Sequence, residues 1–206
     1  MMDRKRREFR FVQNNRRTLR LSKTVSLRAD ATRNREKLIE IARVLFARGD
    51  VPVTIEEIAK QAKVGVGTLY RHFPAREELV EAVYRTELDA LLEDVERLLK
   101  RRSALAALRL WMDRYAQFVA TKHAMYDTLR LVLTKPSTRS ETRARIGAAL
   151  GRFLDAGAAD RTIRTDIQPD DLAVNLAAIV LGVRLSTDKK QLGRLLDLLI
   201  DGLRPH

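Results

Sequence analysis

The sequence predicts an all-α protein, in which a small N-terminal helical domain is joined by a long helix to a larger C-terminal helical domain. Apolar residues recur three and four positions apart from Ala31 almost to the C-terminus, and this is the period of one helix face. Start and stop signals divide the pattern into about nine helices. We find no convincing alternation of apolar and polar residues, which would indicate half-buried strands.

We divide the chain into an N-terminal extension (1–30), a first helical domain (31–90) and a second helical domain (91–206). Residues 1–28 carry ten Lys and Arg side chains against two acidic ones, and apolar residues are sparse there. One interpretation of this extension is a disordered segment, or sequence translated upstream of the true start. The other is a basic arm that lies along DNA, as blocks of like charge sometimes do.

The first domain begins with a helix that starts near Ala31 and ends at Gly49, a residue typical of helix C-termini. A second helix starts at Thr54, whose hydroxyl can accept from a free backbone N–H while Glu57 reaches back to it. A brief third helix is predicted over Val66–His72, because Pro74 prevents its simple continuation. A long fourth helix then runs from about Ala75 to Leu99, with acidic residues in its first turn.

Five further helices are predicted after the long one. Pro136 is expected to break the chain, and Gly157 to end the helix before it. Pro169 suits the first position of a helix. The five expected ranges are Ser103–Thr121, Ala124–Leu133, Ser140–Ala156, Pro169–Leu185 and Lys190–Leu203.

Residues 54–73 read TIEEIAKQAKVGVGTLYRHF and have the layout of a helix-turn-helix. In that motif, two helices cross at a tight turn and the second enters the major groove of DNA. Ile58, Val64, Leu69 and Phe73 form the expected apolar side. The outer side keeps a glycine, which permits close approach, and polar side chains that can donate hydrogen bonds to phosphates or bases.

This stretch resembles the DNA-binding domain of the tetracycline-repressor (TetR) family. The string VGVGTLYRHFP followed by REELVEAV is the most specific part of the resemblance. The residues that carry it are Leu38–Phe46, Thr54–Ala59, Val64–Pro74 and Glu77–Val83.

The resemblance implies that residues 66–72 are the recognition helix and that neighbouring side chains meet the DNA backbone. For Arg33 and Arg76 the alternative of a solvated helix end stays open. The residues expected to bind DNA are Arg33, Thr54, Lys63, Val66, Gly67, Thr68, Tyr70, Arg71, His72 and Arg76.

Two residues depart from the pattern of the family. Lys63 stands where glycine is frequent, and a left-handed backbone there has a strain cost of about 1 kcal/mol for lysine. Gly65 stands where serine often caps the recognition helix, and glycine is the weaker cap by only a few tenths of a kcal/mol.

The resemblance also implies that the second domain senses a small-molecule ligand and forms dimers. Aromatic side chains at helical spacing make a plausible pocket, although the same stripe also suits an ordinary core. The candidate pocket residues are Trp111, Tyr115, Phe118, Met125, Tyr126 and Arg130.

The second-last helix has an apolar face with small residues that allow close approach of another helix. The last helix is apolar around much of its circumference, so it must be buried on more than one side. A four-helix bundle formed by two chains satisfies that requirement. Burial against residues 103–157 of the same chain is the alternative. The candidate dimer residues are Leu172, Leu176, Ile179, Val183, Leu195, Leu196 and Leu199.

These features together favour a sequence-specific transcription regulator that represses from a pseudo-palindromic site on double-stranded DNA and is released by a ligand. Activation, or regulation without a ligand, stays open as an alternative. The other alternative is an architectural nucleic-acid binder without sequence preference, driven by the basic extension. We expect no enzyme, catalytic residue, metal or cofactor, because cysteine is absent and the three histidines form no recognisable site. No apolar run approaches the ~18 residues of a membrane span, so a cytoplasmic protein without a membrane partner is expected.

Overall fold

The computed structural model describes residues 30–47, 53–124, 136–183, 188 and 190–205. These residues form eight helices and no strand, which confirms the all-α prediction. The first helix covers residues 30–47. The others are α2 (Ile55–Ala62), α3 (Val66–His72), α4 (Arg76–Leu99), α5 (Ala104–Ala124), α7 (Pro136–Ala159), α8 (Pro169–Val183) and α9 (Gln191–Gly202). The stop expected at Gly49 and most of the helix expected over 124–133 lie outside the described residues.

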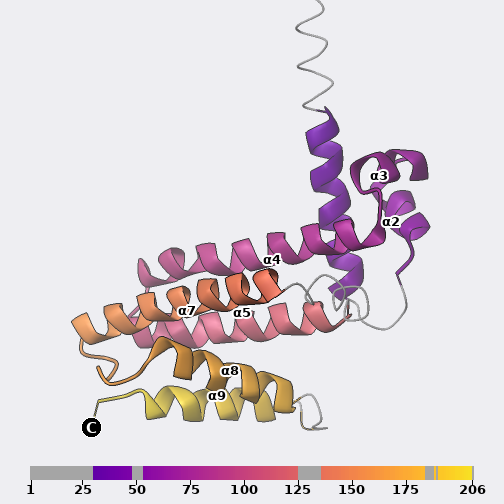
Figure 1. Ribbon diagram of the computed structural model, residues 1–206. Helices are drawn as coiled ribbons and strands as arrows, with labels where there is room; N and C mark the ends of the chain where they lie inside the picture. Colours follow the sequence, from indigo (N-terminus) through magenta and orange to yellow (C-terminus); the bar gives the residue numbers. More distant parts are fainter. Residues whose placement is uncertain (1–29, 48–52, 125–135, 184–187, 189, 206) are drawn as a thin grey trace, which may run out of the picture.

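Figure 1 shows the first helix, α2 and α3 gathered around the beginning of α4, at one end of the molecule. From there α4 runs along the C-terminal bundle, where it packs against α5 and α7. The central helix of the bundle is α5, because it contacts α4, α7, α8 and α9. α4 therefore packs with the N-terminal helices at one end and with the C-terminal bundle along the rest of its length.

The short helices at the N-terminal end hold together because their apolar side chains join the hydrophobic core that continues into the C-terminal bundle. Apolar side chains from the first helix, α2, α3 and α4 meet in it. Isolated helices of this length are marginal in water, so this burial is what stabilises them. Its fully buried members at this end are Leu38, Ala42, Ile58, Ala62, Leu69, Leu79, Val80 and Val83.

At the start of α2, Thr54 Oγ1 accepts from the backbone N–H of Glu57 at 3.2 Å, as the capping prediction requires. The carboxylate of Glu57 accepts from Gln61 Nε2 at 3.4 Å and does not return to Thr54. The predicted capping box is thus formed on one side, and Thr54 still fixes where α2 begins.

Two boundaries in the C-terminal bundle differ from prediction. α7 begins at Pro136 and not at the expected Ser140, because proline is tolerated at the first helical position, where its missing N–H has no partner to lose. Gly157 does not end α7, which continues to Ala159. A Cβ at Gly157 would lie 2.4 Å from Ile163 Cγ1, so this glycine lets the chain fold back against the helix.

The end of α7 is stabilised by a turn in which Arg161 adopts a left-handed backbone with φ 59°. Thr162 N–H donates to the Gly157 carbonyl at 2.9 Å and Arg161 N–H to Ala158 at 3.4 Å, the pattern of a Schellman motif. Asp160 Oδ2 then accepts from Ala104 N–H at 3.1 Å. The end of α7 therefore caps the beginning of α5.

Candidate DNA interface and regulatory domain

The turn between α2 and α3 depends on Lys63, which adopts a left-handed backbone with φ 55° and ψ 42°. Lys63 N–H donates to the Lys60 carbonyl at 3.1 Å and Val64 N–H to Ala59 at 3.0 Å. These two bonds form a second Schellman motif, in which glycine is the usual central residue. Lys63 therefore has the left-handed backbone on which the expected strain depends.

α3 is a single short helix held from one side. Gly65 is its N-cap without a side-chain hydrogen bond, and its carbonyl accepts from the backbone N–H groups of Thr68 and Leu69. Leu69 is fully buried and anchors the inner side of the helix. Because Leu69 anchors the inner side, the direction in which the outer side of α3 faces is fixed as well.

The outer side of α3 is open to a partner. Val66, Gly67, Tyr70 and Arg71 are exposed, and Tyr70 keeps 46% of its surface in solvent. A Cβ placed on Gly67 would meet nothing within 4 Å. The accessible face of α3 therefore presents Val66, Tyr70 and Arg71, with Gly67 among them.

Among the other predicted DNA-binding residues, Arg33 and Arg76 have side-chain partners within the chain. Thr68 and His72 are half-buried, and Lys63 is exposed. The guanidinium of Arg33 pairs with Asp30 but stays largely in solvent. Arg76 Nη1 donates to the Val53 carbonyl at 2.6 Å, and its guanidinium lies 5.9 Å from the centre of the Phe46 ring.

Sequence reasoning missed two arginines that join elements of the N-terminal end to one another. The Arg35 guanidinium lies 5.0 Å from the centre of the Phe73 ring, just after α3. Arg43 bonds Glu40 on its own helix and lies 3.5 Å from Glu87 on α4. No sequence motif marks the Arg35–Phe73 and Arg43–Glu87 pairs, because residues far apart along the chain form them.

The aromatic stripe of α5 is packed into the core of the C-terminal bundle, in which α5 contacts α4, α7, α8 and α9. The Trp111 ring stacks on Tyr115 with ring centres 5.8 Å apart and is tilted against Phe153 at the same distance. Phe118 contacts Tyr84 at 5.5 Å. Burial raises the pKa of the Tyr115 hydroxyl. Met125, Tyr126 and Arg130 lie outside the described residues.

Trp111 has a specific partner that its position in the sequence did not indicate. Its indole Nε1 donates to the Leu91 carbonyl of α4 at 2.8 Å, in a fully buried place. Its one polar group is therefore engaged by the chain itself. Trp111 is therefore a core residue and not part of the predicted pocket.

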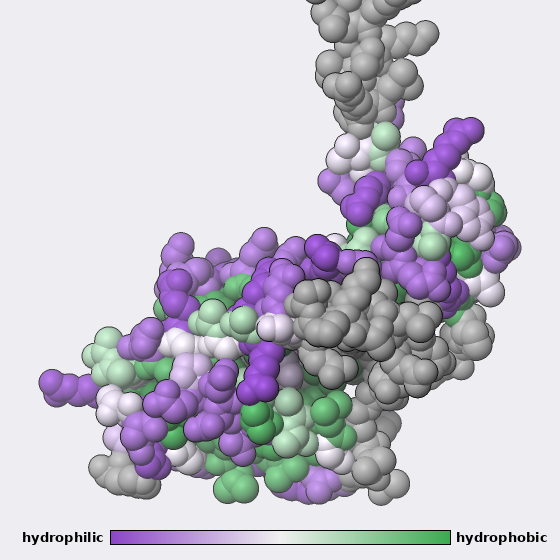
Figure 2. All heavy atoms as spheres, viewed as in Figure 1, coloured by the Kyte–Doolittle hydropathy of each residue, from purple (hydrophilic) through white to green (hydrophobic). Residues whose placement is uncertain are grey.

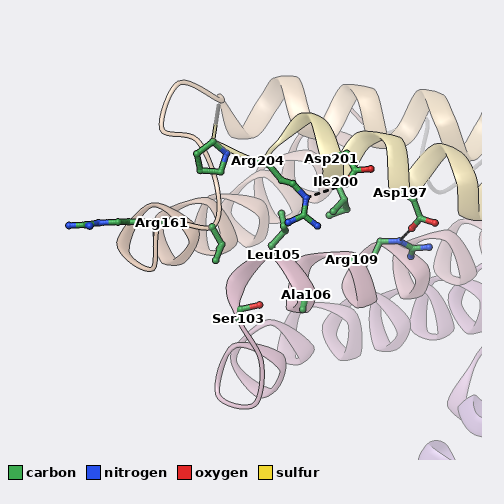
Figure 3. A pocket seen from close by; sticks show the side chains of 11 residues that line it. Ser103, Leu105, Ala106, Arg109, Arg161, Asp197, Ile200, Asp201 and Arg204 are labelled. Carbon is green, nitrogen blue, oxygen red and sulfur yellow. Dashed lines mark hydrogen bonds and ion pairs between the residues drawn. The ribbon is translucent and has the colours of Figure 1, made fainter.

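A hollow of about 690 Å³ opens at the far end of the regulatory domain, where α5 begins and α9 ends. Figure 3 shows that Arg109 of α5 and Asp197 of α9, both among the residues that line it, are paired with each other, with Arg109 Nε and Asp197 Oδ1 2.6 Å apart. Arg204 pairs with Asp201 on α9. Four of the charged side chains that line the hollow are thus paired with one another, whereas Arg161, which also lines it, is exposed. None of the lining residues belongs to the predicted pocket.

The apolar residues of α8 and α9 divide between two faces. Leu172, Leu176 and Leu196 are buried inside the chain, so they face its own core and leave the predicted dimer surface. Ile179, Val183, Leu195 and Leu199 are half-buried. Val174 (55% exposed), Leu181 (57%) and Leu198 (68%) face outward, and Figure 2 shows hydrophobic side chains gathered over this part of the molecule.

Comparison with known proteins matches both ends of this chain to regulators. A family model described as bacterial regulatory proteins of the tetR family matches residues 38–83. A second, the SbtR-like C-terminal domain of transcriptional regulators, matches residues 103–205. A crystallised TetR transcriptional regulator from Streptomyces coelicolor is 40% identical, with 83% of this chain and 98% of that one covered and a TM-score of 0.73.

The chain belongs to the tetR family of bacterial regulatory proteins. A TetR regulator from Mycobacterium vanbaalenii is 30% identical, with 87% and 99% of the two chains covered and a TM-score of 0.67. Helix-turn-helix regulators of Staphylococcus aureus are 39% identical over 67 residues. That match spans 32% of this chain and 36% of each relative.

This TetR-family protein is accordingly a transcription regulator with a helix-turn-helix DNA-binding domain, as its sequence predicted. The family assignment also confirms that it is not an enzyme. Within the described residues, no helix is long and apolar enough to cross a membrane.

Proposed function

We propose that this TetR-family regulator is a homodimeric repressor that binds a pseudo-palindromic operator through α3 and is released by a small-molecule ligand. The observation that carries the proposal is the exposed outer face of α3 on a helix whose inner side is anchored by Leu69. A fixed helix with a free polar face is what major-groove reading requires.

The side chains of that face suit different parts of the duplex. Arg71 can donate two hydrogen bonds to a guanine edge. Thr68 and Tyr70 can bond phosphates or bases, while Val66 and Gly67 let the helix approach closely. Lys63, exposed on the preceding turn, is placed beside α3 and supplies a charge for a phosphate.

Dimer formation is supported by the outward apolar side chains of α8 and α9. Val174 and Leu181 of α8 and Leu198 of α9 are exposed, and α8 packs against α9. A large exposed apolar surface marks an interaction site. Two copies of these helices would form a four-helix bundle about a two-fold axis. The half-buried Ile179, Val183, Leu195 and Leu199 would then complete an interface centred on Val174, Leu181 and Leu198.

We place the ligand near Tyr115 and Phe118, with Met125, Tyr126 and Arg130 as the other candidate contacts. A wall of aromatic side chains with a few polar groups is typical of small-molecule pockets. For release, the ligand must bind one tilt of α4 more tightly than another, since only a difference in affinity shifts the equilibrium.

The proposal is tested by selecting duplexes from a random pool with the full chain at physiological salt and counting the chains in the selected complex. Enrichment of a pseudo-palindrome bound by an even number of chains supports it. Uniform binding that vanishes with added salt overturns it and supports the architectural alternative. Deleting residues 1–28 separates the two further, because the repressor keeps its sequence preference whereas an architectural binder loses most of its affinity.

A further inference from the structure

The C-terminal half of α4 is joined to α5 at two successive points. At the first, the buried Trp111 indole N–H donates to the Leu91 carbonyl at 2.8 Å. At the second, the carboxylate of Asp94 pairs with the guanidinium of Arg114. Residues 91 and 94, like 111 and 114, are neighbours on one helix face, so the two links lie side by side between the same helices.

These links are less exposed than two ion pairs that join α4 to α7, although the buried Tyr84 hydroxyl of α4 also donates to Thr142 Oγ1 of α7 at 2.9 Å. Asp89 lies 2.6 Å from Arg145, and Glu96 pairs with Arg152, but these side chains on the α4–α7 side are largely in solvent. Water replaces an exposed partner at little cost. By contrast, the Trp111 indole is fully buried and the Asp94 side chain is 13% exposed. Asp94 also pairs with Arg97 of its own helix, so losing Arg114 removes the tie between the helices but leaves Asp94 one partner.

The same helix also supports the reading face. Leu79, Val80 and Val83 of α4 are fully buried in the core that holds α3 in place. Figure 1 shows α4 running without a break from that core along the regulatory bundle. The angle at which α5 holds α4 therefore sets where α3 points relative to the rest of the chain.

We propose that Trp111 and the Asp94–Arg114 pair, together the α4–α5 clamp, are positioning residues that set the spacing of the two reading helices in the dimer. The inference rests on the proposed function, because spacing has meaning only for a dimer on a two-part operator. With the clamp closed, α4 is held to the regulatory domain and the two α3 helices match one separation of half-sites. With the clamp open, α4 tilts more freely and several separations are tolerated.

The test compares two duplexes, the selected operator and the same operator with one base pair inserted between its half-sites. The measured quantity is the ratio of the two affinities. Trp111→Phe keeps an aromatic ring but loses the N–H, and Arg114→Gln loses the ion pair. Each is expected to reduce the preference for the selected spacing by roughly 2- to 30-fold, the range of mutational effects on coupling between sites. Asp94→Asn combined with Arg114→Gln is expected to add little to either alone, because both changes break one link.

Arg85→Gln is the matched control. Arg85 is an exposed arginine of α4 that pairs with Glu81 on its own helix, so this change alters the charge of α4 without touching α5. It should leave the spacing preference at the wild-type ratio. If Trp111→Phe and Arg114→Gln also keep that ratio, the clamp does not position α3. Should Trp111→Phe fail to fold, Arg114→Gln decides, because Arg114 is partly exposed.

A second measurement tests the clamp without DNA. Amide hydrogen exchange over residues 91–99 of the free protein is expected to become faster in Arg114→Gln and to stay unchanged in Arg85→Gln. Unchanged exchange in both variants overturns the clamp, whatever the DNA experiment gives. A wild-type chain that selects no duplex overturns the proposed function instead, so the two failures are distinguishable.

Discussion

Arg76 Nη1 donates a 2.6 Å hydrogen bond to the carbonyl oxygen of Val53, which joins the first residue of α4 to the segment that leads into α2. The bond is partly buried, and the guanidinium also faces the Phe46 ring. The sequence predicted that Arg76 meets DNA phosphate. Its contacts show that at least part of its role is to hold the N-terminal domain together.

The first prediction concerns this bond. Arg76→Gln is expected to lower the free energy of unfolding by about 1.5–3 kcal/mol, the range for a hydrogen bond that involves a charged group. Urea denaturation of the purified variant measures it. A variant with unchanged stability and weaker DNA binding would instead place Arg76 on the phosphate backbone.

The second prediction concerns the close packing at the end of α7. Gly157→Ala would place a methyl group 2.4 Å from Ile163 Cγ1, so the turn must move, at a cost of about 1–3 kcal/mol. Thermal unfolding gives the difference. The control is Gly202→Ala in α9, where an added Cβ meets nothing within 4 Å and no loss is expected. Equal melting temperatures of the two variants would contradict the packing described here.

The third prediction separates the backbone of Lys63 from its charge. Lys63→Gly and Lys63→Ala both remove the cation, but only glycine adopts the left-handed backbone without strain. The glycine variant is therefore expected to be more stable than the alanine variant by about 1 kcal/mol.

On DNA the same two variants should behave alike. Both are expected to bind all duplexes more weakly, with the salt dependence of the affinity reduced by about one phosphate contact per chain. If wild type and both variants share one salt dependence, Lys63 does not touch the backbone of the duplex.

The fourth prediction tests the proposed dimer surface. Leu198→Glu places a charge on the most exposed leucine of α9, where burial in an interface without a partner is costly. We expect a folded monomer with weak operator binding, measured by sedimentation. Thr165→Glu, an exposed site between α7 and α8, is the control and should remain dimeric. A dimeric Leu198→Glu would move the interface elsewhere.

The sequence predicted the reading domain well because its signals are local. The bounds of α3 are those expected, and α4 was placed within one residue at its start. Thr54, Lys63 and Gly65 act through their immediate neighbours, so capping rules and backbone preferences are enough to interpret them.

Where the prediction failed, the answer depended on contacts between distant residues. Gly157 reads as a helix stop until Ile163 is seen packed against it. Leu196 and Leu198 are both apolar residues of α9, yet one faces the chain's own core and the other solvent. Trp111 fits a pocket wall and a core equally well by its spacing, and only the bond to Leu91 distinguishes them.

The central claim is that the outer face of α3 reads the operator once in each chain of a dimer. The most direct measurement repeats the random-duplex selection with Thr68→Ala, Tyr70→Phe and Arg71→Ala as single variants. We expect at least one of them to relax the base preference at two symmetry-related positions, by about 1–3 kcal/mol each, and any variant that loses only a phosphate contact to weaken all sequences alike. Three variants that keep both the wild-type motif and the wild-type affinity would show that α3 does not read the DNA.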